Sequence, residues 1–262
     1  MSSVVDAGPP TEVRRGAAHW AGGYGAMLRW HLASLRLWLA FLVGIQILSG
    51  VGFVLGIALF FKPIPVSVAL FVSTGVPVVN LLTIGLMLGP QLVASQKIDG
   101  SYDYLRCLPV SRSANALAWY TVTLVGGVPA MVVSLAVAQA RYHLPLHLSA
   151  MIVPAVLLTC FTGTMVGYAV AHALSKATAT RLVTQLLTFA VFSFAPVLYP
   201  VRQLPRWLGT LNWWLPFRQM AVAVRASLTS GPNPGLVTAY IALAIWATAC
   251  AAVSALVLGR RE

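Results

Sequence analysis

Six long apolar runs alternate with short polar stretches along the chain. The runs cover residues 37–61, 66–94, 116–138, 150–173, 182–199 and 236–258. About 20 consecutive apolar residues in a helix cross the hydrocarbon core of a membrane, so each run is long enough to span it. None of the runs has Asp, Glu, Lys or Arg near its centre. The pattern predicts an all-α, polytopic membrane protein with six transmembrane helices.

The chain before the first run has two parts. Residues 1–17 are polar and lack the apolar core of a signal peptide, so we expect a disordered cytoplasmic tail. Residues 18–36 mix Trp20, Tyr24 and several leucines with basic side chains, which predicts an interfacial helix in the headgroup layer. Alternatively, this stretch is the cytoplasmic start of the first span. We expect residues 18–262 to form a single transmembrane domain.

Composition and charge narrow the class of protein. The chain is 59% hydrophobic and only 8% charged, whereas about a quarter of the residues of a soluble domain are charged. The formal charge of +12 raises the question of nucleic-acid binding. However, the basic residues stand singly at the ends of apolar runs, without a dense basic stripe. We therefore expect membrane lipids, and no nucleic acid, as partners.

The basic residues also indicate an orientation. If both termini are cytoplasmic, 11 Lys and Arg residues lie inside and 6 lie outside. This bias favours a multi-pass protein of the cell membrane with cytoplasmic N- and C-termini, although residues 202–225 are unusually basic for an external segment.

Sequence motifs argue against several kinds of chemistry. The chain has no P-loop, so any ATP hydrolysis belongs to another subunit. Its three cysteines are isolated, and His143 and His147 flank a proline in a short loop, so we expect no metal site. No Ser, His and acid grouping indicates a hydrolase. We expect no catalytic residue and no cofactor in this chain, and the uncharged spans disfavour ion-coupled transport.

Polar side chains within the runs are candidates for a solute path. Gln46, Asn80, Thr83, Gln185 and Ser193 are the tentative members. They suit an amphipathic or lipid-like solute. The alternative for each is a hydrogen bond between neighbouring helices.

The segment between the fifth and sixth runs is rich in Trp, Arg and Pro. Trp207, Trp213 and Trp214, with nearby arginines, are typical of an interfacial belt, and Phe217–Leu228 is expected to form an amphipathic helix. We expect a re-entrant segment that dips into the outer leaflet, the alternative being an ordinary surface loop. Its candidate site residues are Pro200, Pro205, Trp207, Trp213, Trp214, Pro216 and Arg225.

Residues 95–112, between the second and third runs, mix opposite charges. This stretch is expected on the cytoplasmic face, with room for a short amphipathic helix. The alternative is a solvated loop that serves only to hold the topology.

Two segments carry a recognisable pattern. In residues 95–112 its positions are Gln96, Lys97, Gly100, Ser101, Asp103, Leu105, Pro109, Ser111 and Arg112. In residues 195–228 they are Pro196, Tyr199, Pro200, Leu204, Pro205, Trp207, Leu208, Pro216 and Arg225. Both segments resemble the permease subunits of ABC-2 type exporters, which include daunorubicin-resistance-like drug exporters and lipid or polysaccharide exporters. The chain departs from the family pattern at Ile98, Asp99, Leu215 and Ala223, and Gln96 stands in place of a usual Glu.

The resemblance implies a permease that pairs with a second, identical or related permease and with two ABC ATPase subunits, which bind ATP and Mg²⁺. A short helix within Ile98–Leu108 would be the coupling helix that contacts the ATPase. Its expected contact residues are Lys97, Asp99, Gly100, Asp103, Tyr104 and Arg106. The exported solute would be drug-, lipid- or glycan-like. The alternatives are a membrane scaffold that transports nothing and a secondary carrier.

Overall fold

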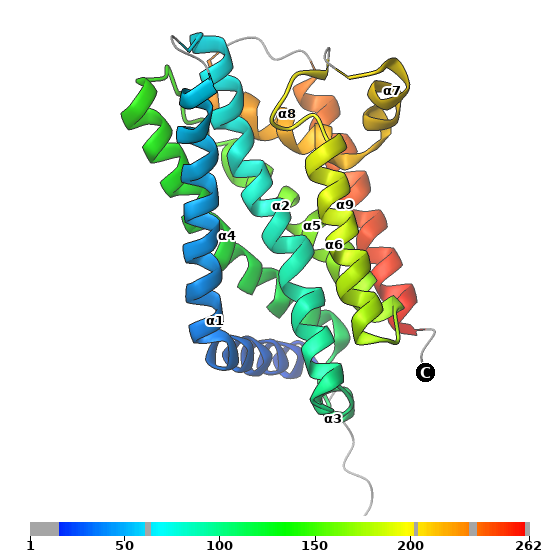
Figure 1. The fold of residues 1–262 in the computed structure, drawn as a ribbon. Coiled ribbons are helices and arrows are strands. Elements are labelled where there is room, and N and C mark those ends of the chain that lie inside the picture. The colour runs from blue at the N-terminus through cyan, green and yellow to red at the C-terminus, as the bar shows by residue number, and fades with distance from the viewer. Residues whose placement is uncertain (1–15, 61–63, 202–203, 231–234, 260–262) are drawn as a thin grey trace, which may run out of the picture.

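Figure 1 shows the computed structural model, which describes residues 16–60, 64–201, 204–230 and 235–259. Six helices in this part of the chain are long and apolar enough to cross a membrane. They are α1 (Ala17–Phe60), α2 (Val66–Ile98), α4 (Arg112–Tyr142), α5 (Ile152–Ala173), α6 (Ala177–Phe194) and α9 (Leu236–Gly259). The predicted all-α architecture with six spans is confirmed. The predicted tail, residues 1–17, lies outside the described residues except for Gly16 and Ala17.

In the described residues, three shorter helices lie at the two ends of the bundle. Helix α3 (Ser101–Cys107) follows α2 at one end, and α7 (Arg206–Trp214) and α8 (Pro216–Leu228) lie at the opposite end (Figure 1). We call these the α3 end and the α8 end. Between α2 and α3, Gly100 has φ of 73°, a left-handed conformation that glycine adopts without steric cost. This turn allows α3 to begin directly after α2.

Helix α1 changes direction within its length. Its first part lies across the α3 end, and the remainder runs along the bundle (Figure 1). The first part is tied to α4, because the Trp20 indole donates to Ser113 Oγ at 2.9 Å and the Tyr24 hydroxyl pairs with Thr121 at 2.9 Å. The expected interfacial helix over residues 18–36 is therefore continuous with the first span. Its place in the headgroup layer stays a prediction.

Helix α6 requires a correction to the predicted fifth span. The helix begins and ends five residues before the predicted run 182–199. It stops at Phe194 because Ala195, which precedes Pro196, has the extended conformation that a following proline imposes. At its start, threonines bury their hydroxyls by donating to the carbonyl four residues earlier, which hydropathy does not anticipate. These residues are Thr180, Thr184 and Thr188.

Helix α2 is the centre of the bundle. It is the most buried of the six long helices and packs against α1, α4, α5, α6 and α8. Its contact with α5 is especially close, since a Cβ atom added at Gly167 would lie 2.7 Å from the Gly85 carbonyl oxygen. Small residues allow such close backbone approach, and dispersion contacts then hold the helices together within a membrane.

This close contact predicts that Gly167→Ala destabilises the protein. The new methyl group would meet backbone atoms of α2, so the two helices must separate, at a cost of about 1–3 kcal/mol. Thermal unfolding in detergent should show a lower midpoint than for the parent protein. Gly89→Ala, which adds the same methyl group to open space in α2, is the matched control. Equal midpoints for the two variants would contradict the proposed packing.

Candidate functional site

Helix α3 and the turn that precedes it present an exposed surface at this end of the bundle. Ile98 and Tyr104 are 62% and 65% exposed, and Asp99 and Gly100 are also exposed. Asp103 and Arg106 lie on α3, but their side chains are outside the described part of the structure. Among the described residues of the predicted ATPase contact, Asp99, Gly100 and Tyr104 are therefore accessible to a partner.

Lys97 has a different environment from the other predicted contact residues. Its Nζ atom donates to the carbonyl oxygens of Ala171 and Leu174, both at 2.6 Å, at the C-terminus of α5. It also lies 5.2 Å from the centre of the Tyr102 ring. A cation is stabilising at the negative end of a helix dipole. Lys97 therefore fixes the last turn of α2, directly before α3, against α5, a role that the sequence did not indicate because the partners are more than 70 residues apart.

A chain of polar and aromatic contacts leads from α3 to α1. The centre of the Tyr102 ring lies 5.9 Å from the centre of the His172 ring. The His172 ring centre in turn lies 4.1 Å from the Tyr168 ring centre. The Tyr168 hydroxyl accepts from Asn115 Nδ2 at 3.2 Å, and Asn115 Oδ1 pairs with His31 Nε2 at 3.1 Å. These contacts link α3, α5, α4 and α1 in turn. We call this set the polar chain.

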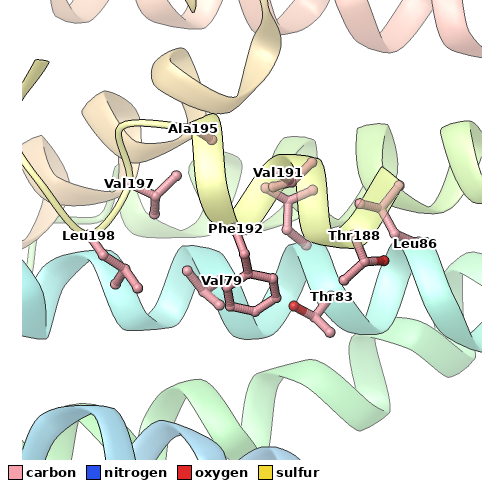
Figure 2. A pocket seen from close by; sticks show the side chains of 10 residues that line it. Val79, Thr83, Leu86, Thr188, Val191, Phe192, Ala195, Val197 and Leu198 are labelled. Carbon is pink, nitrogen blue, oxygen red and sulfur yellow. The ribbon is translucent and has the colours of Figure 1, made fainter. Parts of the chain in front are cut away.

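A groove lies between α2 and α6, near the α8 end of α6 (Figure 2). Its cavity volume is about 10 Å³, which is room for about one water molecule. Its wall is apolar except for the hydroxyl groups of Thr83 and Thr188. The lining residues are Val79, Leu82, Thr83, Leu86, Thr188, Val191, Phe192, Ala195, Val197 and Leu198. Only Thr83 was among the predicted path residues, because apolar residues of a span give no signal that separates a groove from a packed interface.

The five predicted path residues do not meet at one site. Gln46 and Asn80 are buried together between α1 and α2, where Gln46 Nε2 donates to the Asn80 carbonyl oxygen at 3.1 Å. Gln46 therefore forms the cross-helix hydrogen bond that was the alternative interpretation. Thr83 lines the groove, whereas Gln185 and Ser193 are exposed on α6.

At the α8 end, a half-buried arginine joins three segments. Arg225 Nε donates to Thr74 Oγ1 at 3.1 Å, and Nη2 donates to the carbonyl oxygens of Val197 at 3.1 Å and Phe71 at 3.3 Å. The guanidinium also lies 3.7 Å from the centre of the Phe71 ring. Burial lowers the pKa of Arg225 to about 10, so the group stays charged at neutral pH. Arg225 thus locks α8 to α2 and to the segment after α6.

The rest of the α7–α8 segment agrees in part with its predicted form. Helix α8 begins at Pro216, one residue before the predicted start at Phe217, and Pro216 suits the first turn because its missing N–H is not needed there. Trp207, Trp213 and Trp214 are exposed, as are Pro200 and Pro205, whereas Pro216 is buried. The position of this segment in the outer leaflet stays a prediction.

The fold defines a multi-pass integral membrane protein. A family model described as ABC-2 family transporter protein matches residues 64–256, which is more than half of the chain. The chain therefore belongs to this family, and the predicted resemblance is confirmed. No curated protein matches it. Family membership identifies the transmembrane component of an ABC transporter and implies association with an ABC ATPase subunit.

The Arg225 contacts predict that this residue is needed for stability. Arg225→Ala would remove the donor to the Val197 carbonyl oxygen, at a cost of about 1–3 kcal/mol for a buried group left unsatisfied, whereas the Phe71 carbonyl oxygen keeps its bond from Thr74 Oγ1. Arg225→Lys should restore only part of the loss, since an ammonium group cannot reproduce the planar guanidinium fork. Thermal unfolding in detergent measures both effects.

The matched control for Arg225 is Arg141→Ala, which removes an exposed arginine from the same end of the bundle. Its effect should stay within about 0.5 kcal/mol. If Arg141→Ala and Arg225→Ala lower the unfolding midpoint equally, the contacts of Arg225 do not stabilise the fold.

Proposed function

We propose that this chain is the permease subunit of an ATP-driven exporter, in which a separate ABC ATPase drives transport through α3. The observation that carries the proposal is the uncovered surface of α3, held in place by Lys97 at the end of a membrane bundle. A free surface of aromatic and charged residues next to a fixed anchor suits contact with a partner. Because the chain has no P-loop, the ATP and Mg²⁺ belong to that partner.

The proposed orientation places the α3 end in the cytoplasm, where the ATPase and ATP are. Exposed basic residues at this end support the orientation, since cytoplasmic flanks of membrane spans are enriched in Lys and Arg. They are Arg29, Arg36, Arg112, Lys176 and Arg181. Both chain termini would then be cytoplasmic.

Movement of α3 would reach the groove through rigid contacts. Helix α3 follows α2 after a single turn, and Lys97 and the polar chain connect this region with α5, α4 and α1. Helix α2 also forms one wall of the groove. When the ATPase displaces α3, α2 therefore moves with it as a rigid body and shifts relative to α6. Other switches use rigid-body movements of this kind.

The groove favours a solute with an apolar part. Its wall is made of aliphatic side chains and Phe192, with two threonine hydroxyls as the polar groups. Such a surface suits a drug-like or lipid-like molecule better than a bare glycan, whose many hydroxyls would lose hydrogen bonds with water. Two permeases, identical or related, would enclose the complete pathway.

The first test concerns the α3 contact. Reversing both charges, with Asp103→Arg and Arg106→Asp, should reduce co-purification of the ABC ATPase at least tenfold, because a like-charge contact costs several kcal/mol. Membrane insertion should be unchanged. Lys176→Glu, which reverses an exposed charge at the same end but directly before α6, should leave the ATPase bound. Normal co-purification of the double variant would contradict the α3 contact.

The second test concerns the groove. Thr83→Phe places a ring where the hydroxyl now lines the groove, and should lower uptake of a fluorescent amphiphile into inverted vesicles at least fivefold, because the passage is filled. The matched control is Leu186→Phe, which changes an exposed residue on α6. Uptake that is equal for the two variants, with the ATPase bound in both, would exclude the groove as the path. A complete absence of ATP-dependent uptake by the parent complex would favour the scaffold.

A further inference from the structure

Helix α7 carries its largest apolar side chains on the face that points away from the protein. Trp207, Leu211 and Trp214 occupy positions i, i+4 and i+7, which share one face of a helix. They are 67%, 50% and 74% exposed. On an adjoining face of the helix, Leu208 and Asn212 are buried. This arrangement is the reverse of a helix that packs its apolar face on a protein core.

The orientation of α7 is fixed by hydrogen bonds on its inner side. Asn212 Nδ2 donates to the carbonyl oxygen of Phe194, at the end of α6, at 2.8 Å, and also to that of Leu208 within α7 at 3.0 Å. At the end of the helix, the Trp214 carbonyl oxygen accepts from Trp246 Nε1 of α9 at 2.9 Å. Rotation of the aromatic face toward the bundle would break the bonds to Phe194 and from Trp246. Hydrogen bonds of the fold therefore keep the exposed face of α7, formed by Trp207, Leu211 and Trp214, turned away from the bundle.

Two arginines flank this face. Arg206 is exposed in the first turn of α7. Arg218, in α8, lies with its guanidinium carbon 4.4 Å from the centre of the Trp213 ring, so its charge is held against the last turn of α7. The sequence has no Asp or Glu between Tyr104 and Arg261 or between Val13 and Ile98. The segments at the α8 end therefore supply no carboxylate that could pair with these cations.

We propose that the exposed face of α7, together with Arg206 and Arg218, binds anionic phospholipids of the adjoining leaflet. Tryptophan rings suit the boundary between headgroups and acyl chains, and guanidinium groups bind phosphate oxygens in a bidentate manner. A second copy of the chain fits this surface poorly, because its α8 end would present the same cations without a carboxylate. In this proposal, the aromatic face contacts the apolar acyl chain of the lipid, and the two arginines bind its negative headgroup.

The test uses the full chain in nanodiscs made of phosphatidylcholine and phosphatidylglycerol, in which one lipid at a time carries bromine near the headgroup. Bromine quenches tryptophan fluorescence on contact. At equal mole fraction, brominated phosphatidylglycerol should quench at least 1.5-fold more than brominated phosphatidylcholine. Replacing both Trp207 and Trp214 by Phe should remove this difference, which assigns it to α7 among the eight tryptophans.

Charge variants test the role of the arginines. Arg206→Gln and Arg218→Gln should each reduce the preference for the anionic lipid, and together they should abolish it. Arg141→Gln removes one exposed charge from the same end without touching α7, and should keep the preference. Unfolding midpoints equal to that of the parent protein show that the variants are folded.

Equal quenching by both lipids, or an unchanged preference in the double arginine variant, would overturn the proposal. Absence of quenching together with crosslinks between the α7 helices of two copies would assign the surface to a permease contact and also overturn it. The experiment needs neither ATP nor the ATPase, so its outcome is independent of the proposed transport function.

Discussion

The close approach of α2 and α5 is the constraint on which the rest of the structure depends. Their backbones meet at Gly85 and Gly167, where neither helix has room for a side chain. Because α2 lies against α5 at this distance, its other faces are available to α1, α4, α6 and α8. A central helix that is surrounded in this way can be apolar all around, which explains why α2 shows no distinct polar face.

The same helix connects the two ends of the bundle. At the α3 end, Lys97 binds the C-terminal carbonyl oxygens of α5, and at the α8 end, Thr74 and Phe71 accept hydrogen bonds from Arg225. Both anchors are cations that donate to backbone or hydroxyl oxygens. In a chain with five acidic residues, such oxygens are available acceptors for basic side chains. The arrangement makes α2 a rigid link between the proposed ATPase contact and the α7–α8 segment.

Run length and hydropathy were sufficient to predict the six spans, and the Trp-, Arg- and Pro-rich composition predicted helix α8 almost to the residue. The pattern misplaced α6, since a proline ended the helix early and self-satisfied threonines extended its start. Contacts between residues far apart in the sequence could not be predicted. The residues around Lys97 do not indicate that its partners lie on α5, and those around Gln46 do not indicate its bond to Asn80. The groove escaped prediction because its wall is chemically the same as a lipid-facing or packed surface.

The threonines of α6 have a mechanical consequence. Thr180, Thr184 and Thr188 donate within their own helix, and in the described part of the chain the side-chain hydrogen bond between α6 and α2 is that from Arg181 to Ser95, at the α3 end. Between that point and the end of α6, the described contacts with α2 are apolar and rely on dispersion, which has no preferred direction. The next polar link is Arg225, which binds Thr74 of α2 and Val197 just after α6. The middle of α6 can therefore shift against α2 while polar contacts hold the two ends of the helix.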